Sequence, residues 1–139
     1  MTQTIVDAGP LVALFRSTDN HHDWATSQFK RLKVPLLTCE AVLSETAFLL
    51  RSGGVDPATV LDAVDRGIVR LDFSLAGEIE PVKRLMRRYA NIGTSLADAC
   101  LVRMSEIHSD CQVMTIDRDF SIYRRNGRRV IPLIAPFDA

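Results

Sequence analysis

Apolar residues follow two alternating patterns along the chain, short continuous runs and longer stretches in which they recur at helical spacing. The short runs occupy residues 4–6, 35–37, 68–71, 113–116 and 130–131. Helical spacing covers residues 11–15, 23–32, 38–51, 56–66, 75–89 and 96–108. Short apolar strands that alternate with helices are typical of α/β proteins. The pattern therefore predicts a mostly parallel sheet with helices on both faces.

Residues at the ends of these stretches fit the predicted helices. Pro10 suits a first helical turn, because the backbone amide hydrogen that it lacks has no partner there. Thr38 can cap the helix that follows it, and Gly53-Gly54 can end that helix. The chain has 139 residues, of which 47% are hydrophobic, so we expect one domain over residues 1–139 with an ample core.

Asp98 is the most unusual residue in this pattern, because residues 95–102 around it are otherwise small or apolar. Removing an ionised carboxylate from water costs several kcal/mol unless a cation or strong hydrogen-bond donors compensate. Asp7, Glu45 and Asp117 stand in comparably apolar stretches. Four such acids with no obvious basic partner suggest that they share one divalent metal ion.

The predicted fold gives these four acids a common location. Asp7 and Asp117 directly follow predicted strands, and ligands of open α/β sheets bind beyond the carboxyl ends of the strands. Asp98 is near the start of a helix at the same edge. Glu45 lies in a helix, and its neighbours three and four residues away are apolar, so we expect its side chain to leave from the packed side. All four can therefore converge.

A cluster of carboxylates is suited to a particular chemistry. Mg²⁺ takes oxygen ligands in octahedral geometry and usually keeps several waters, which leaves room for a phosphate oxygen. A metal held in this way lowers the pKa of bound water and neutralises charge on the phosphate. Hydrolysis of a phosphodiester is the reaction that these properties favour.

The four acids and their surroundings resemble those of PIN-domain nucleases, and most closely the VapC-type toxins of toxin–antitoxin pairs. The similarity covers nearly the entire chain and rests on the order and spacing of several short segments rather than on any single one. These segments are Asp7 after the first strand, Val42-Leu43-Ser44-Glu45, Leu96-Ala97-Asp98-Ala99 and Thr115-Ile116-Asp117-Arg118-Asp119-Phe120.

The resemblance implies a three-layer α/β/α domain and a metal-dependent endoribonuclease. Its catalytic acids, which hold Mg²⁺ or Mn²⁺, would be Asp7, Glu45, Asp98 and Asp117. It also implies a homodimer, a cognate antitoxin whose tail occupies the acidic site, and inhibition of translation and growth. Asp119 is a secondary catalytic candidate that could equally cap the short helix after it.

Thr115 is a second subsidiary candidate, because it matches a hydroxyl position that orients an acid or a metal-bound water in this family. Taken singly, each acid has a structural explanation, since Asp7 or Asp98 could cap a helix and any of the four could join a buried salt bridge. The ordered set favours a shared site.

Two other functions remain open from the sequence. The same acids would serve a PIN-type nuclease of RNA processing or DNA repair. A non-catalytic acidic module that binds a basic protein segment is an alternative from another class. A phosphotransfer enzyme of the haloacid dehalogenase type fits poorly, because Asp7 lacks the second aspartate that follows closely in that family.

Positive charge is clustered, although Lys+Arg and Asp+Glu both number 17. One cluster spans residues 83–88 and suits either a solvated helix face or contact with a partner. The other lies near the carboxyl end, and we expect it to contact RNA because arginine binds phosphate with two hydrogen bonds. Its members are Arg118, Arg124, Arg125, Arg128 and Arg129.

The remaining residues with reactive side chains suggest no second site. His21 and His22 lie in a polar loop without other ligands nearby in sequence. The three cysteines lack metal-site spacing, and we expect them to be reduced and structural. The amino terminus shows no secretory signal and no run is apolar enough to span a bilayer, so a soluble cytoplasmic protein is expected.

Overall fold

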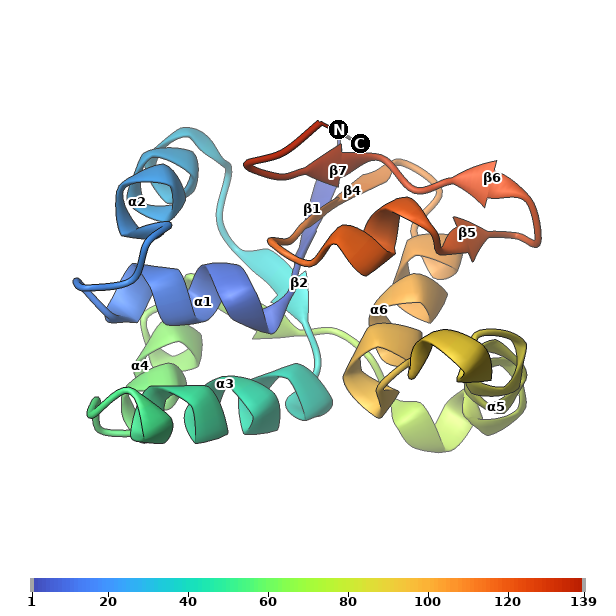
Figure 1. Ribbon diagram of the computed structural model, residues 1–139, viewed down its shortest axis with the longest axis horizontal. Helices are drawn as coiled ribbons and strands as arrows, with labels where there is room; N and C mark the ends of the chain where they lie inside the picture. The colour runs from blue at the N-terminus through green and yellow to red at the C-terminus, as the bar shows by residue number, and fades with distance from the viewer. Residues whose placement is uncertain (1, 139) are drawn as a thin grey trace.

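The computed structural model describes residues 2–138 and contains a central parallel sheet with helices on both sides (Figure 1). The strands of that sheet are β1 (Gln3–Val6), β2 (Leu36–Thr38), β3 (Val69–Leu71), β4 (Cys111–Met114) and β7 (Leu133–Ile134). The helices are α1 (Ala8–Phe15), α2 (His22–Arg31), α3 (Glu40–Ser52), α4 (Thr59–Asp65), α5 (Ile79–Arg88) and α6 (Leu96–Ile107). This three-layer arrangement confirms the predicted fold class.

The strand order is β3-β2-β1-β4-β7, and every pairing in this sheet is parallel. The chain moves from β1 outward to β2 and β3, and then crosses to β4 on the other side of β1. Right-handed connections place helices on opposite faces when the direction reverses. Figure 1 shows the result, with α1 to α4 on one side of the strands and α5 and α6 on the other.

The reversal creates a crevice at the carboxyl ends of β1 and β4, which are neighbours in the sheet. Val6 pairs with Met114, so the two strands end level with each other. Residues that follow these strands therefore meet at the point where α/β sheets bind their ligands. Asp7 follows β1, and the loop that carries Asp117 follows β4.

Apolar side chains of the strands form the core. Ile5, Leu36, Leu37, Val113 and Met114 are fully buried. Burial of a side chain of this size stabilises a fold by roughly 1.5–3 kcal/mol. The strands are mostly apolar because helices cover both faces of the sheet, as expected for a buried parallel sheet.

Several predicted boundaries were wrong. Helix α1 starts at Ala8, before the predicted residue 11. Helix α3 is capped at Cys39, one residue after the predicted Thr38. The predicted helix at 75–89 is divided into a 3₁₀ turn (η1, Leu75–Gly77) and α5. The strand predicted at 113–116 ends at Met114, which leaves Thr115 in the loop beside the acids.

The carboxyl-terminal region differs most from the prediction. The apolar pair at 130–131 does not extend the main sheet, because β6 (Arg129–Val130) pairs with β5 (Arg124–Arg125) in a separate antiparallel hairpin. Asn126 and Gly127 form its turn with φ of 52° and 85°. Three residues, 126–128, separate the paired Arg125 and Arg129, and positive φ is common in such short hairpin loops. The sheet edge is instead formed by β7.

Two further expectations can be compared with the structure. Cys39, Cys100 and Cys111 are buried and unbridged, as expected. Within residues 2–138, no helix combines the length and apolar character needed to cross a membrane.

Candidate active site

Asp7 is held at the centre of the crevice by its place at the junction of β1 and α1. Its Oδ1 accepts a hydrogen bond of 2.7 Å from the Ala8 amide, so the carboxylate caps α1. The side chain is buried. Burial and the charges of Asp98 and Glu45 raise its pKa to about 7, against the opposing effect of the Thr115 hydrogen bond. Without a bound cation, protons therefore compete for this carboxylate near neutral pH.

Thr115 connects Asp7 to the loop after β4. Its Oγ1 donates to Asp7 Oδ2 at 2.7 Å and accepts from the Asp117 amide at 2.9 Å. The side chain is fully buried, so this hydroxyl has a fixed orientation. It thus sets the position of one acid through a direct bond and of another through the backbone. These hydrogen bonds fit the orienting role that the resemblance implied for Thr115, and that role stays a prediction.

Asp98 lies in the first turn of α6, where Ser95 is the N-cap. The Ser95 hydroxyl accepts a hydrogen bond from the Asp98 amide at 3.0 Å. Ser95 therefore caps the helix, and the Asp98 carboxylate does not. That carboxylate is buried, and its Oδ2 accepts a 2.7 Å hydrogen bond from the Tyr123 hydroxyl. Burial raises the pKa of Asp98, Tyr123 opposes that effect, and the charge of Asp117 adds to it.

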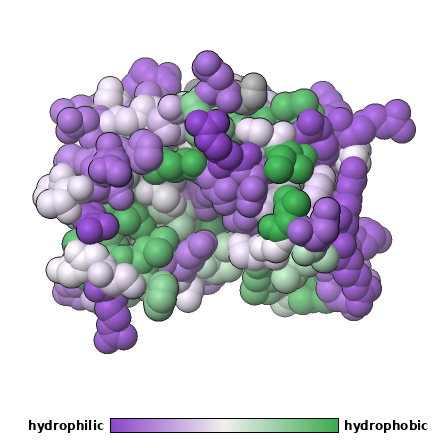
Figure 2. Space-filling view, in the orientation of Figure 1, coloured by the Kyte–Doolittle hydropathy of each residue, from purple (hydrophilic) through white to green (hydrophobic). Residues whose placement is uncertain are grey.

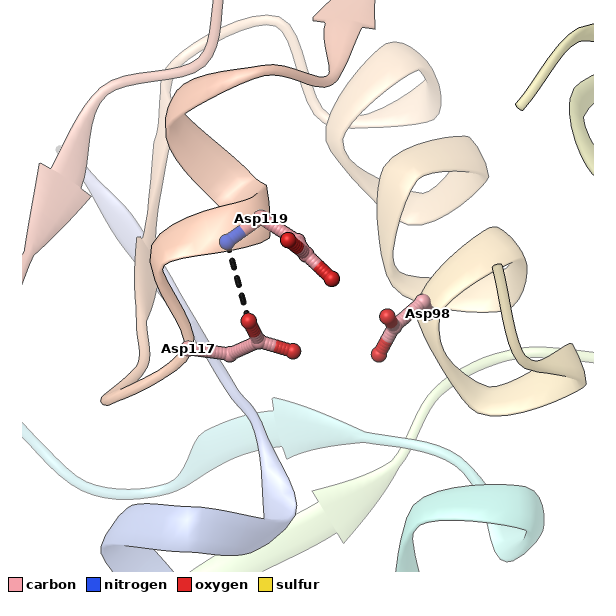
Figure 3. A group of neighbouring side chains, drawn as sticks. All are labelled: Asp98, Asp117 and Asp119. Atoms are coloured by element: carbon pink, nitrogen blue, oxygen red, sulfur yellow. Dashed lines mark hydrogen bonds between the residues drawn. The ribbon is translucent and has the colours of Figure 1, made fainter. Parts of the chain in front are cut away.

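Asp117 and Asp119 face Asp98 across the crevice (Figure 3). Asp117 caps a 3₁₀ turn (η3, Arg118–Ser121) by accepting from the Asp119 amide at 2.9 Å. The three carboxylates each offer an oxygen within 4.8 Å of the others. Asp119 does not cap the short helix, which was its alternative explanation, because Asp117 does so.

Glu45 differs from its prediction. We expected its side chain to leave from the packed side of the helix, but it is exposed, as are its neighbours Phe48 and Leu49 on the same edge of α3. Apolar neighbours at helical spacing indicated a buried stripe, and here part of that stripe faces solvent. Glu45 still reaches the site, because it lines one pocket of about 270 Å³ together with Asp7, Asp98 and Asp117.

Burial, and to a smaller extent mutual repulsion, raises the pKa of Asp7, Glu45 and Asp98. Desolvation raises the pKa of Glu45, and the charges of Asp98 and Asp117 add to that increase. The four predicted acids and Asp119 are called the five acids from here on. Within residues 2–138, no ion pair involves any of them. Carboxylates that crowd together without a basic partner favour a divalent cation with oxygen ligands. The donor set therefore fits Mg²⁺ or Mn²⁺ chemically.

The predicted RNA-binding arginines have different surroundings. Arg125 is buried, and its guanidinium donates to the carbonyls of His108 and Ser109, which fastens the hairpin to the end of α6. Arg124 donates from Nη1 to three carbonyls of the η3 region. Both guanidinium groups use hydrogen bonds to backbone carbonyls to fix the local fold. We therefore leave Arg124 and Arg125 out of the proposed RNA-binding surface.

The other three arginines of that set remain accessible. Arg118 is exposed and its guanidinium lies 4.6 Å from the centre of the Phe137 ring. Arg128 and Arg129 are exposed on the hairpin. Their role in RNA binding stays a prediction.

Comparison with known proteins defines the family. The model of the PIN domain matches residues 4–126. The chain belongs to the PIN-domain family. Among solved structures, it is similar to Mycobacterium tuberculosis VapC20, described as a toxin that cleaves the sarcin–ricin loop. The match has a TM-score of 0.75 and 24% identity, and it covers 86% of this chain and 94% of that one. No curated protein sequence matches the chain.

Within this PIN domain, Tyr123 is a site residue that sequence analysis missed. The tyrosine is fully buried and stacks edge-on against Phe120 and Tyr89, with ring centres 5.0 Å apart in each case. In the sequence, Tyr123 follows Phe120 by three residues. That spacing puts both rings on one side of a helical turn, and it is the one sequence feature that could have drawn attention to Tyr123. That signal indicates packing, and it does not show that the hydroxyl reaches Asp98.

We expect Tyr123→Phe to lower RNA cleavage by about 10- to 100-fold, because partners that orient a metal ligand typically matter by that factor. Loss of the buried hydrogen bond should also lower the free energy of unfolding by about 1–2 kcal/mol. The matched control is Tyr89→Phe, which removes a hydroxyl that accepts from the Arg124 amide and touches no acid. Cleavage and urea-unfolding assays of both variants test this. Equal cleavage by the two would show that the Tyr123 hydroxyl has no role beyond packing.

Proposed function

We propose that this chain is a metal-dependent endoribonuclease and the toxin of a VapBC-type toxin–antitoxin pair that inhibits translation and growth. One observation carries the proposal. In a PIN domain, five acids gather where the sheet reverses direction, and within residues 2–138 none of them has a basic ion-pair partner. The likeness to VapC20, a toxin that cleaves an RNA loop, supports the RNA substrate and the biological role.

The residues divide into three roles in this proposal. Asp98, Asp117 and Asp119 hold the metal, because their oxygens lie closest together. Asp7 completes the acidic site from the end of β1, with Thr115 fixing its orientation. Glu45 lies at the exposed rim, where a phosphate would enter from solvent. When bound, Mg²⁺ or Mn²⁺ supplies Lewis acidity and a more acidic water for attack on phosphorus.

The test is cleavage of an RNA panel that includes a sarcin–ricin-type stem–loop, in Mg²⁺ or Mn²⁺ and in EDTA. We expect specific cuts with either metal and a loss of at least about 100-fold in EDTA, because the acids alone cannot neutralise charge on the phosphate. Full cleavage in EDTA would overturn the metal site. A panel of single-stranded DNA distinguishes an endoribonuclease from a DNA-repair nuclease. A repair nuclease would cut the DNA and leave the RNA intact.

A partner-binding module remains the rival from another class. Titration calorimetry with Mn²⁺ separates the two, since a docking module would bind a basic peptide without binding the metal. Heat from Mn²⁺ binding that disappears in Asp98→Asn would support the enzyme.

The wider context of the proposal follows from the toxin interpretation. We propose that residues 1–139 act as one domain in the cytoplasm, form a homodimer and are inhibited by a cognate antitoxin. Expression of the chain alone should stop growth, and co-expression with the protein encoded by the adjacent reading frame should restore it. Growth that is unaffected by an active nuclease would favour a role in RNA processing.

A further inference from the structure

We propose that a cleft between α5, α6 and the β5–β6 turn binds phosphate groups of the RNA substrate, at a distance from the acids that cut it. This inference rests on the proposed function. The cleft has a volume of about 640 Å³, and we call it the arginine cleft. Its walls carry Arg84, Arg87, Arg88 and Arg103, with Pro81, Leu85, Glu106 and Gly127 completing the lining.

Two hydrogen bonds assemble the cleft from segments far apart in sequence. Arg88 donates to the Gly127 carbonyl, and Glu106 accepts from the Asn126 amide at 2.7 Å. The hairpin turn is thereby fixed against both helices. As a result, the basic cluster at residues 83–88 and the exposed arginines of the hairpin, Arg128 and Arg129, belong to one surface.

The charges in the cleft are not balanced by its own acids. Arg103 is paired with Glu78 and Glu106, so those three side chains largely satisfy one another. Arg84 and Arg87 are exposed, and within residues 2–138 neither makes a hydrogen bond or an ion pair. The four arginines of the lining, set against Glu106 and Glu78, leave a net charge of +2 in a chain whose formal net charge is zero.

A row of aromatic contacts links the cleft to the acidic site. The Arg88 guanidinium lies 5.3 Å from the Tyr89 ring, Tyr89 stacks on Tyr123, and the Tyr123 hydroxyl reaches Asp98. Figure 2 shows hydrophilic side chains along the right edge of this face, over α5 and the hairpin turn. The buried Tyr89 and Tyr123 rings thus connect one wall of the arginine cleft to an acid of the site.

RNA is the occupant that the chemistry favours. Guanidinium groups bind phosphate through two parallel hydrogen bonds, and the apolar floor formed by Pro81 and Leu85 suits a ribose or base face. The five acids repel a polyanion, so cleavage needs attraction from a separate group of cations nearby. The cleft supplies that attraction without placing cations among the metal ligands.

The test compares RNA binding by three double variants of the full chain, in EDTA so that no cleavage occurs. Arg84→Gln/Arg87→Gln removes two cleft cations. Arg51→Gln/Arg66→Gln is the matched control, because these exposed arginines lie at the end of α3 and after α4, on the other side of the molecule. Arg84→Lys/Arg87→Lys keeps the charge and removes the guanidinium fork. Binding of a labelled stem–loop RNA is followed by fluorescence anisotropy between 50 and 300 mM salt, roughly the range over which phosphate contacts are screened.

We expect the glutamine variant to bind at least about ten-fold more weakly at 0.1 M salt. Its log–log salt slope should fall by about two, because each substitution removes one cation that pairs with a phosphate. The control should bind like the wild type, and the lysine variant should keep the slope while losing part of the affinity. A glutamine variant that binds like the control would overturn the cleft. Tighter binding of polyglutamate than of RNA, if it depends on Arg84 and Arg87, would also overturn the proposal. That result would indicate an acidic protein partner.

Parallel cleavage assays with Mg²⁺ keep this result separate from the proposed function. A wild type that cuts RNA, together with a glutamine variant that binds normally, would disprove the cleft and leave the nuclease intact. A wild type that binds RNA through the cleft and cuts nothing would support the cleft and disprove the nuclease.

Discussion

Asp98→Asn should remove RNA cleavage almost completely while leaving the fold intact. The substitution keeps the size of the side chain and an oxygen that can still accept from Tyr123, but it removes a charge that faces Asp117 and Asp119. Loss of one such electrostatic group typically slows an enzyme by roughly 10²–10³-fold. Because the remaining acids repel one another less, the metal-free variant should be at least as stable as the wild type.

Initial rates of cleavage in Mg²⁺ and urea unfolding in EDTA measure both parts of this expectation. The control is Asp65→Asn, an equal change at an exposed acid at the end of α4, which should behave like the wild type in both assays. An Asp98→Asn protein that cuts RNA at the wild-type rate would disprove the metal site. One that unfolds much more easily would show that Asp98 serves the structure instead.

The sequence was sufficient for four of the five strands of the main sheet and for the shared location of Asp7 and Asp117. Continuous apolar runs identified β1, β2, β3 and β4, and the general rule for ligand sites in α/β sheets then placed Asp7 and Asp117 in one crevice. Both steps depend on local periodicity and on chain order, which a single sequence contains. The short β7 has only two residues, and a run of that length carries no periodicity to detect.

Features that depend on how distant segments pack were not predictable in this way. Glu45 has apolar neighbours, yet α3 leaves that edge uncovered, and no local pattern shows which edge of a helix another element covers. Arg125 belongs to a basic run, but the hairpin turns it inward to the carbonyls at the end of α6. Charge counts likewise could not show that residues 83–88 meet the hairpin turn.

Asp7 connects the stability of the protein to its proposed function. Its carboxylate is buried beside other acids, and this burial destabilises the metal-free fold when Asp7 is ionised. The pKa of Asp7 is raised to about 7, from an unfolded value of 3.8. Protonated Asp7 therefore stabilises the folded state fully below pH 3.8, and this contribution is lost as the pH rises through about 7.

We therefore expect Asp7→Asn, measured in EDTA, to be more stable than the wild type at pH 8 by up to about 4 kcal/mol, which corresponds to three pKa units. The difference should shrink as the pH falls and nearly vanish at pH 4, where the wild-type carboxyl is neutral in the folded state and close to half neutral in the unfolded one. Urea unfolding at several pH values measures it, with Asp65→Asn as the exposed control. Mn²⁺ should stabilise the wild type increasingly as the pH rises, because protons compete for the same oxygens, and should stabilise the variant much less. A variant that is no more stable than the wild type at pH 8 would mean that Asp7 is already ionised at little cost in the metal-free fold, and that its two hydrogen bonds, from Ala8 and Thr115, outweigh its burial.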